Sequence, residues 1–287
     1  MPSCFFASDL HGRVDRYNKL FDAIRAERPA ALFLGGDLLP FGVGPAPASH
    51  PSHPGFVSDF LAPEFEALRS DLGGRYPRVF VILGNDDAQV EEEAVLEVAT
   101  RRLWDYAHNR RIDWIGFAVY GYAIVPPTPF LLKDWERYDV SRFVDPGCVS
   151  PEEGWRTVPV AAHELQYGTV SSDLAALAKD DDLARAIFLF HAPPYQSLLD
   201  RAALDGRMVD HVPLDVHVGS IAVRRFLEAR QPLVSLHGHV HESARLTGSW
   251  RDRIGRTLAF SAAHDGPELA LVRFDPDDPA SATRELL

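Results

Sequence analysis

Five short polar segments carry the side chains of this sequence that could do chemistry. They are Asp9-Leu10-His11, Gly35-Gly36-Asp37, Gly84-Asn85-Asp86-Asp87, His191-Ala192-Pro193-Pro194 and His237-Gly238-His239-Val240-His241. Each one directly follows an apolar run that is typical of a buried strand. Because residues two apart in an extended chain point the same way, each Asp-x-His or His-x-His pair presents two donors to one side. Imidazole, carboxylate and amide groups without a thiolate suit divalent ions such as Mn, Fe, Zn, Co or Ni.

The apolar runs alternate with amphipathic segments, and this alternation predicts where the five polar segments lie. Strands are expected near residues 4–8, 30–34, 78–83, 186–190 and 233–236, and helices near residues 13–27, 57–72, 89–103, 171–179 and 220–230. Strands that alternate with helices predict βαβ units and a mostly parallel, buried sheet. In such sheets the reactive crevice lies outside the carboxyl ends of the strands, so all five segments should converge on one rim.

The rest of the sequence shows the alternation of strands and helices less regularly. Residues 112–125 are expected to form paired strands with turns at the glycines, and residues 126–168 are irregular and rich in Pro, Trp and Tyr. Two late strands, near 256–262 and 268–274, are expected to precede a Pro/Asp-rich tail. Neither an internal repeat nor a long linker is present. The sequence therefore predicts one domain, 1–287, with inserted loops at about 40–56, 126–168 and 195–218.

The ordered series Asp-x-His, Gly-Asp, Gly-Asn, a single His after a strand and Gly-His-x-His resembles the calcineurin-like metallophosphoesterase family. The resemblance spans residues 9–241. It implies a four-layer α/β sandwich with two central mixed sheets flanked by helices. It also implies hydrolysis of a phosphate ester by a hydroxide that two divalent ions activate. The ligands that it implies are Asp9, His11 and His241 for the first ion, Asn85, His191 and His239 for the second, and Asp37 for both.

The sequence departs from the family at the residue after Asn85. Many members read Gly-Asn-His, and that histidine is the usual candidate for protonating the leaving oxygen, but Asp86 stands here. Two neighbouring cations should lower the pKa of Asp86, which would make it a poor proton donor. Members without the histidine often favour phosphodiesters or activated esters. We therefore expect catalysis that involves Asn85 and Asp86 on a small phosphodiester such as a cyclic nucleotide. A phosphomonoesterase for nucleotides or phosphoprotein, and a metal-binding scaffold without catalysis, are the alternatives.

Further polar positions each have a functional and a structural interpretation. Arg13 could meet a substrate phosphate at the start of the first helix, or lie on solvated helix surface. His217, in the segment after the His191 strand, could contact substrate or support the next helix. His237 falls inside its strand and could touch the site or have a structural role. His50 and His53 belong either to a flap or to an ordinary surface loop.

The bulk composition limits the choice of partners. A formal net charge of −12 opposes binding of a long nucleic acid, so a small phosphorylated substrate is the expected partner. Only two cysteines are present, Cys4 and Cys148, and they predict no disulfide framework. The sequence contains neither a signal peptide pattern nor a membrane-spanning apolar stretch, so we expect a cytoplasmic protein. A homo-oligomer is compatible with the sequence.

Overall fold

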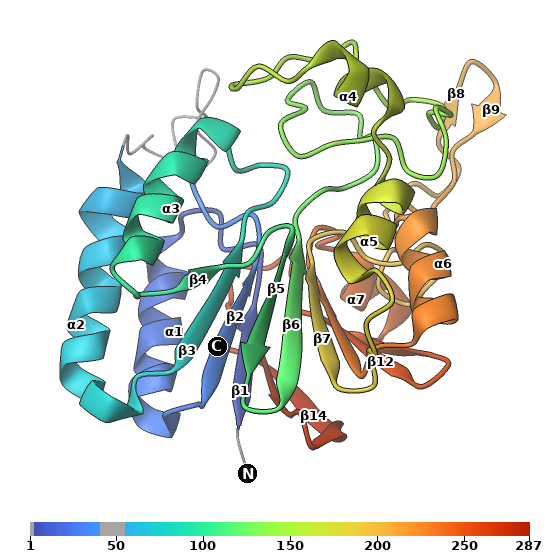
Figure 1. Ribbon diagram of the computed structural model, residues 1–287. Coiled ribbons are helices and arrows are strands. Elements are labelled where there is room, and N and C mark those ends of the chain that lie inside the picture. Colours follow the sequence, from blue (N-terminus) through green and yellow to red (C-terminus); the bar gives the residue numbers. More distant parts are fainter. Residues whose placement is uncertain (1–2, 41–54) are drawn as a thin grey trace.

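The apolar runs of the sequence form two six-stranded sheets that lie between two layers of helices (Figure 1). The computed structural model describes residues 3–40 and 55–287. Figure 1 shows α1, α2 and α3 on the outer side of one sheet and α5 and α6 on the outer side of the other. The predicted four-layer α/β sandwich with two central mixed sheets is confirmed.

The first sheet has the order β14-β13-β1-β2-β3-β4. Its strands are β1 (Cys4–Ala7), β2 (Ala31–Gly35), β3 (Arg78–Ile82), β4 (Asp105–Tyr106), β13 (Ala270–Asp275) and β14 (Asp278–Leu286). The first four run parallel, whereas β13 is antiparallel to β1 and β14 is antiparallel to β13. The parallel strands β1, β2 and β3 thus bring three of the five polar segments to one edge.

The second sheet has the order β11-β12-β10-β7-β6-β5. Its strands are β5 (Arg110–Trp114), β6 (Phe117–Tyr122), β7 (Ala186–Phe190), β10 (Val234–His237), β11 (Arg251–Ile254) and β12 (Thr257–Ser261). The central four run parallel, and the edge strands β5 and β11 pair antiparallel with their neighbours. The predicted paired strands around residues 112–125 are β5 and β6. Strands β7 and β10 deliver the other two polar segments.

Five of the helices match the predicted amphipathic segments closely, whereas the short helices at Ala162–Tyr167 and Ser243–Thr247 were not predicted. They are α1 (Val14–Glu27), α2 (Ala62–Leu72), α3 (Glu92–Thr100), α4 (Ala162–Tyr167), α5 (Val170–Ala178), α6 (Ile221–Arg230) and α7 (Ser243–Thr247), with the shorter turns η1 (Val57–Leu61), η2 (Gly73–Arg75) and η3 (Gln89–Glu91). Helix α1 buries Tyr17, Leu20, Phe21 and Ile24 as predicted, but Val14 is 41% exposed at its first turn. None of the helices within residues 3–40 and 55–287 has the length and apolar character needed to cross a membrane.

Aromatic side chains hold the two sheets face to face. The ring of Trp114 on β5 lies 6.3 Å from that of Phe33 and 6.0 Å from that of Phe80, both on the first sheet. Phe260 on β12 lies 6.0 Å from Phe274 on β13. Full burial of one such side chain stabilises the fold by about 1.5–3 kcal/mol. Because the sheets are fixed against each other, the loops at their carboxyl ends share one rim.

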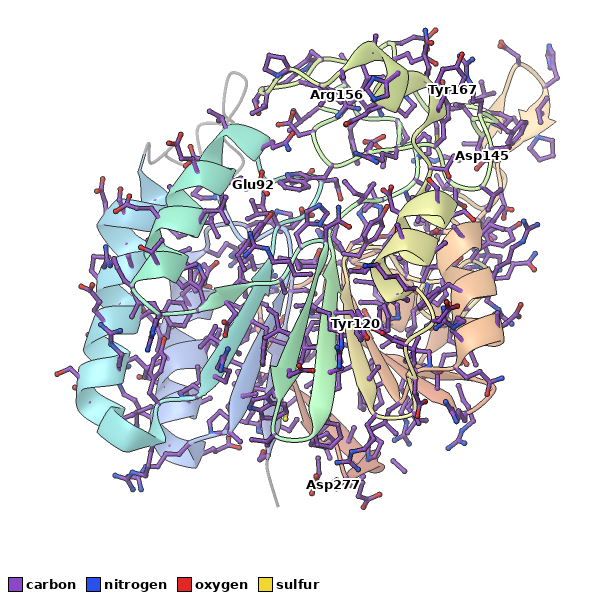
Figure 2. The ribbon with its side chains drawn as sticks, in the orientation of Figure 1. Glu92, Tyr120, Asp145, Arg156, Tyr167 and Asp277 are labelled. Carbon is purple, nitrogen blue, oxygen red and sulfur yellow. The ribbon has the colours of Figure 1, made fainter. Side chains whose placement is uncertain are left out.

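The irregular segment 126–168 covers this rim and contains α4 as its helix. Figure 2 shows Asp145, Arg156 and Tyr167 at the end of the molecule opposite Asp277. Within the segment, Nζ of Lys133 lies 2.6 Å from a carboxylate oxygen of Glu136, and both side chains are fully buried. The indole of Trp135 donates a hydrogen bond of 2.7 Å to the carbonyl of Asp87. The segment is therefore tied directly to the loop that follows β3.

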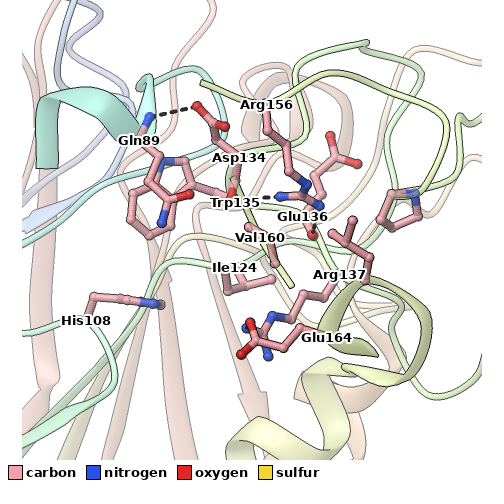
Figure 3. A pocket seen from close by; sticks show the side chains of 12 residues that line it. Gln89, His108, Ile124, Asp134, Trp135, Glu136, Arg137, Arg156, Val160 and Glu164 are labelled. Carbon is pink, nitrogen blue, oxygen red and sulfur yellow. Dashed lines mark hydrogen bonds and ion pairs between the residues drawn. The ribbon is translucent and has the colours of Figure 1, made fainter. Parts of the chain in front are cut away.

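A small polar pocket of about 100 Å³ lies between this segment and the start of α3 (Figure 3). The carboxylate of Asp134 accepts a hydrogen bond of 2.7 Å from the backbone N–H of Gln89. The guanidinium of Arg156 donates to the carbonyls of Asp134 and Glu136. The Asp134 contact ties the segment to the turn before α3, and the Arg156 contacts brace it internally.

The expectation of a Pro/Asp-rich tail after residue 274 is wrong. Residues 275–278 form a tight turn, and the chain returns as β14, which pairs with β13. Pro279 is tolerated because β14 is an edge strand, where a missing N–H leaves no neighbouring strand unpaired. The short β4, the hairpin of β8 (Met208–Val209) and β9 (Val212–Pro213), and α7 were also not predicted. Each is too short to show a clear periodicity.

Candidate metal centre

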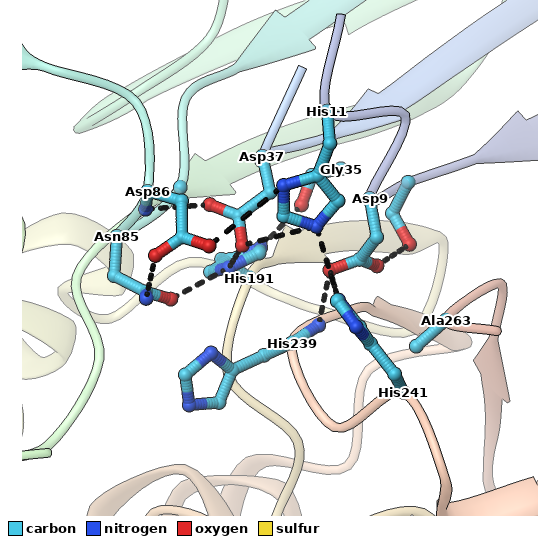
Figure 4. Close-up of polar contacts among 12 residues, drawn as sticks. Asp9, His11, Gly35, Asp37, Asn85, Asp86, His191, His239, His241 and Ala263 are labelled. Carbon is cyan, nitrogen blue, oxygen red and sulfur yellow. Dashed lines mark hydrogen bonds and ion pairs between the residues drawn. The ribbon is translucent and has the colours of Figure 1, made fainter. Parts of the chain in front are cut away.

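The seven predicted metal ligands converge at the carboxyl ends of five strands from both sheets (Figure 4). Asp9 and His11 follow β1, Asp37 follows β2 and Asn85 follows β3. From the second sheet, His191 follows β7, and His239 and His241 follow β10. The side chains of Asp9, Asp37 and His191 are almost completely buried.

Their donor atoms form two groups that share one carboxylate. One potential ligand atom each from Asp9, His11, Asp37 and His241 lies within 4.8 Å of the others, and the same holds for Asp37, His191 and His239. Oδ1 of Asn85 lies 3.0 Å from Nε2 of His191, which places the amide beside the second group. Asp37 therefore stands between two groups of donors.

The donors approach one another closely. Nε2 of His11 lies 3.1 Å from Nε2 of His241, and the latter lies 3.2 Å from Oδ1 of Asp9. On the other side, Oδ2 of Asp37 lies 3.3 Å from Nε2 of His191. Carboxylates and ring nitrogens packed so densely in a buried place need positive charge between them, either protons or metal ions.

The two buried carboxylates are held in the ionised form. Burial alone would raise the pKa of Asp9, but the hydrogen bond with His241 and the nearby imidazoles bring it well below its usual range. Burial likewise acts on Asp37, and the neighbouring His191 and His11 overcome it and lower the pKa to about 2. Both carboxylates are thus available as anionic ligands at neutral pH.

The histidines divide into two classes. Burial opposes the charge on His191, but Asp37 and Asp9 raise its pKa to about 10. In the same way, Asp9 raises the pKa of His241 to about 9 against the effect of burial. Burial lowers the pKa of His11, and lowers that of His239 to about 4. The same carboxylates that would attract divalent ions thus favour protons on His191 and His241.

The backbone is strained where it presents these side chains. The φ angles of Asp9, His11, Asp37 and His239 are 57°, 47°, 52° and 74°. Left-handed conformations are uncommon for residues other than glycine, and they concentrate at functional sites. Each of these turns redirects the chain directly after a strand, so that the side chain points across the rim.

Two glycines leave the space that the carboxylates occupy. A Cβ atom on Gly84 would lie 2.3 Å from Oδ1 of Asp37, and a Cβ atom on Gly238 would lie 2.6 Å from Oδ2 of Asp9. Both distances are far below van der Waals contact. The close approach of backbone to ligand therefore explains why these two motifs contain glycine.

Several residues that position the site have no clear signal in the sequence. Arg16 is buried and donates a hydrogen bond of 2.6 Å to the carbonyl of Asp9. Asp87 is fully buried and accepts hydrogen bonds from the backbone N–H groups of Leu38, Leu39 and Gly84, which joins the loops after β2 and β3. Asp87 is adjacent to the Gly-Asn-Asp motif, and that adjacency is the one signal that pointed to it.

The orientation of His191 suits a metal ligand. Its Nδ1 lies 2.8 Å from the carbonyl oxygen of Gly35 and can donate to it, which leaves Nε2 facing Asp37 and Asn85. A metal-binding histidine commonly has its other ring nitrogen fixed in this way by a carbonyl or carboxylate.

Asp86 lies at the edge of the two groups. Its backbone N–H donates to Oδ1 of Asp37 at 2.8 Å, and its carboxylate accepts a hydrogen bond of 3.0 Å from Nδ2 of Asn85. Oδ2 of Asp86 lies 3.7 Å from Nδ1 of His11. Burial and the charges of Asp37 and Asp87 raise the pKa of Asp86 to about 8 in the metal-free protein. Divalent ions would act in the opposite direction, as expected from the sequence.

The remaining candidates differ in their positions. The guanidinium of Arg13 pairs with Asp15 at 3.2 Å and contacts none of the seven ligands among the described residues. Nδ1 of His217 lies 2.8 Å from Oδ1 of Asp200, and its ring lines a cavity that also reaches His239. His237 is buried, contacts the carbonyl of Ala192 and the hydroxyl of Ser235, and stacks on Phe190, so its role here is structural. His50 and His53 lie outside the described residues.

Comparisons with known proteins agree with this architecture. The family model described as calcineurin-like phosphoesterase matches residues 4–243. The protein TT1561 of Thermus thermophilus is similar over 99% of this chain and 98% of its own, with 16% identity and a TM-score of 0.57. Phosphopantetheinyl hydrolase from Mycobacterium tuberculosis is similar over 92% of this chain and 90% of its own, with 12% identity and a TM-score of 0.51. At these identities the two structures share the fold with this chain. No curated protein sequence matches it.

Proposed function

Since the chain belongs to the calcineurin-like phosphoesterase family, we propose that it is a metal-dependent phosphodiesterase. Its substrate in this proposal is a small phosphodiester such as a cyclic nucleotide, and its location is the cytoplasm. The observation that supports the proposal most strongly is the position of Asp37, which belongs to both groups of donor atoms. A carboxylate shared by two sets of imidazole, carboxylate and amide donors suits a pair of divalent ions a few ångströms apart.

The donors fit such ions in type as well as in position. Asp9, His11 and His241 would hold the first ion, Asn85, His191 and His239 the second, and Asp37 both. Nitrogen and oxygen donors without sulfur suit Mn, Fe, Zn, Co or Ni. When bound, the ions would withdraw charge from the phosphoryl oxygens and lower the pKa of water toward neutrality.

The chain itself supplies further groups for the reaction. Nδ2 of Asn85 is a hydrogen-bond donor beside the second group, a suitable partner for a non-bridging phosphoryl oxygen. Asp86 contacts both Asn85 and His11 at the rim, and we assign it a position next to the leaving group of the substrate. A carboxylate there cannot protonate a poor leaving group as an imidazolium would. This favours diesters over monoesters, because a monoester brings a second negative charge close to Asp86.

A substrate panel combined with metal analysis tests the proposal. The protein loaded in turn with Mn, Fe, Zn, Co or Ni is expected to bind two ions per chain and to hydrolyse bis(4-nitrophenyl) phosphate faster than 4-nitrophenyl phosphate. Removal of the metals with a chelator should abolish both activities, and their return should restore them. Turnover of the monoester alone would favour the phosphomonoesterase for nucleotides or phosphoprotein. Two bound ions with no turnover of any ester would favour the non-catalytic scaffold.

The replacement Asp86→His tests the assignment of the rim position. We expect turnover of the monoester to rise relative to that of the diester by about tenfold, because an imidazolium can donate a proton and attracts the dianion. The ratio of the two kcat/KM values is the measurement. Asp22→His, at a side chain that is 79% exposed on α1, is the matched control and should leave the ratio unchanged. An unchanged ratio in Asp86→His would show that Asp86 does not lie next to the leaving group.

A further inference from the structure

A cavity of about 360 Å³ opens beside the candidate metal centre. His239, a candidate ligand of the second ion, lies in its wall together with its neighbour Val240. Most of the other lining comes from two segments outside the ligand motifs, residues 126–148 and residues 195–221, and Glu242 adds to it. The volume is within the range of about 300–1,000 Å³ that is typical of sites for small organic molecules.

The lining is mainly apolar. Prolines, phenylalanines and branched aliphatic side chains make it so, among them Phe130, Phe143 and Leu214. The residues Phe130 and Phe143 are 56% and 69% exposed, whereas phenylalanine is usually buried. Gly147 of the first segment lies close to Leu214 of the second, so the two segments meet at the cavity. A concave apolar surface of this kind is suited to burying an organic group.

Besides the imidazoles of His217 and His239, the ionisable groups of the lining are mainly carboxylates. Among the described residues of its lining there are four carboxylates, from Asp139, Asp145, Asp215 and Glu242, and neither a lysine nor an arginine. Asp139 accepts hydrogen bonds from backbone N–H groups at the start of α6, and Asp215 accepts one from the hydroxyl of Tyr195. Asp145 forms no side-chain hydrogen bond or ion pair within the described part of the chain, and it lies near enough to Asp215 for repulsion. The cavity therefore repels anions.

We propose that this cavity binds the organic group of the substrate, and that it selects an apolar group without a negative charge. The proposal rests on the proposed function and narrows its substrate class. The phosphodiester would lie at the metal centre, and its organic substituent would extend past His239 into the cavity. Diesters that carry a further phosphate or carboxylate on that substituent would be rejected.

A series of diesters with a common 4-nitrophenol leaving group measures the apolar preference. The second substituent is methyl in one compound and phenyl in the other, and the metal-loaded protein is used throughout. We expect kcat/KM to be about tenfold higher for the phenyl ester, the effect of burying about 50–60 Å² more apolar surface. Leu214→Asp should abolish this preference. Val212→Asp is the matched control, because Val212 is 46% exposed, lies two residues earlier and is not part of the lining.

A second pair of diesters measures the charge selection. The substituents are 4-carbamoylphenyl and 4-carboxyphenyl, which have nearly the same shape but differ by one negative charge. We expect the carboxylate to react about tenfold more slowly, and Asp145→Lys to narrow that gap. Asp277→Lys changes the net charge equally at the opposite end of the molecule (Figure 2) and should leave the gap as it is.

Binding measurements separate failure of this proposal from failure of the proposed function. Calorimetric titration of the metal-loaded protein with methyl and phenyl esters of a non-hydrolysable phosphonate reports on the cavity without turnover. Tighter binding of the phenyl ester that is lost in Leu214→Asp would support the cavity even if no diester were hydrolysed. Hydrolysis of both diesters at equal kcat/KM, with equal binding of both phosphonates, would overturn the cavity proposal and leave the proposed function intact.

Discussion

Asp37→Ala is expected to lower kcat/KM for a diester by at least about a thousandfold, equivalent to ~4 kcal/mol of transition-state stabilisation. Asp37 is the one side chain that belongs to both groups of donors. Its loss would remove a ligand from each ion, and it would also leave the backbone N–H of Asp86 without its acceptor. We expect bound metal to fall below two ions per chain.

The fold should survive this change, because Asp37 lies in a loop after β2 and the core does not depend on it. Circular dichroism and elemental analysis of the purified variant give the two measurements. His191→Ala should behave alike, and His163→Ala, at an exposed histidine of α4, is its matched control. If Asp37→Ala or His191→Ala kept both metals and full turnover, the assignment of the centre would be wrong.

Gly84→Ala is expected to damage the centre without altering any ligand. The added Cβ would lie 2.3 Å from Oδ1 of Asp37 and 2.7 Å from Cε1 of His191, so the loop or both side chains must move. Overpacking of this kind costs about 1–3 kcal/mol of folding free energy. A displacement of about 1 Å at a reacting centre lowers the rate by about a hundredfold. We therefore expect a lower melting temperature, weaker metal binding and a loss of activity near that size.

Gly74→Ala provides the control for this substitution. Gly74 lies in the short turn η2, and a Cβ there would meet nothing within 4 Å. The same chemical change should therefore leave metal content and activity unchanged. Equal metal content and activity in Gly84→Ala and the wild-type protein would show that the loop after β3 is not held against Asp37 as described.

Two segments that line the cavity surround the candidate metal centre. Residues 126–148 and 195–221 contain none of the seven assigned ligands, and hydrogen bonds tie them to the loop after β3 and to each other. Trp135 bonds to the carbonyl of Asp87, and the carboxylate of Asp139 accepts hydrogen bonds from the first turn of α6. We therefore expect the metal centre to determine which reaction occurs and these two segments to select the organic substituent of the ester.

The sequence by itself determined the fold class and the set of residues that meet at the rim. Runs of buried apolar residues alternate with amphipathic helices such as α1, and this local periodicity is visible without tertiary contacts. Since each polar segment follows its strand directly, parallel pairing is enough to bring Asp9, Asp37 and Asn85 together. The structure adds a reason for the glycines beside the ligands, because a Cβ atom on Gly84 or Gly238 would overlap a ligand carboxylate.

Other features were decided by the tertiary structure alone. Arg16 donates a hydrogen bond to the carbonyl of Asp9 across the turn before α1, and His217 shares a cavity with His239; no local sequence pattern encodes either arrangement. The edge strand β14 forms because β13 offers it an unpaired neighbour, although its composition is typical of a tail. The segment 126–168 is held by individual hydrogen bonds to distant parts of the chain, such as that from Trp135 to the carbonyl of Asp87. The ligand motifs are local and therefore visible in the sequence. The long-range packing of the segments around them decides which groups of a substrate can lie beside the metal centre.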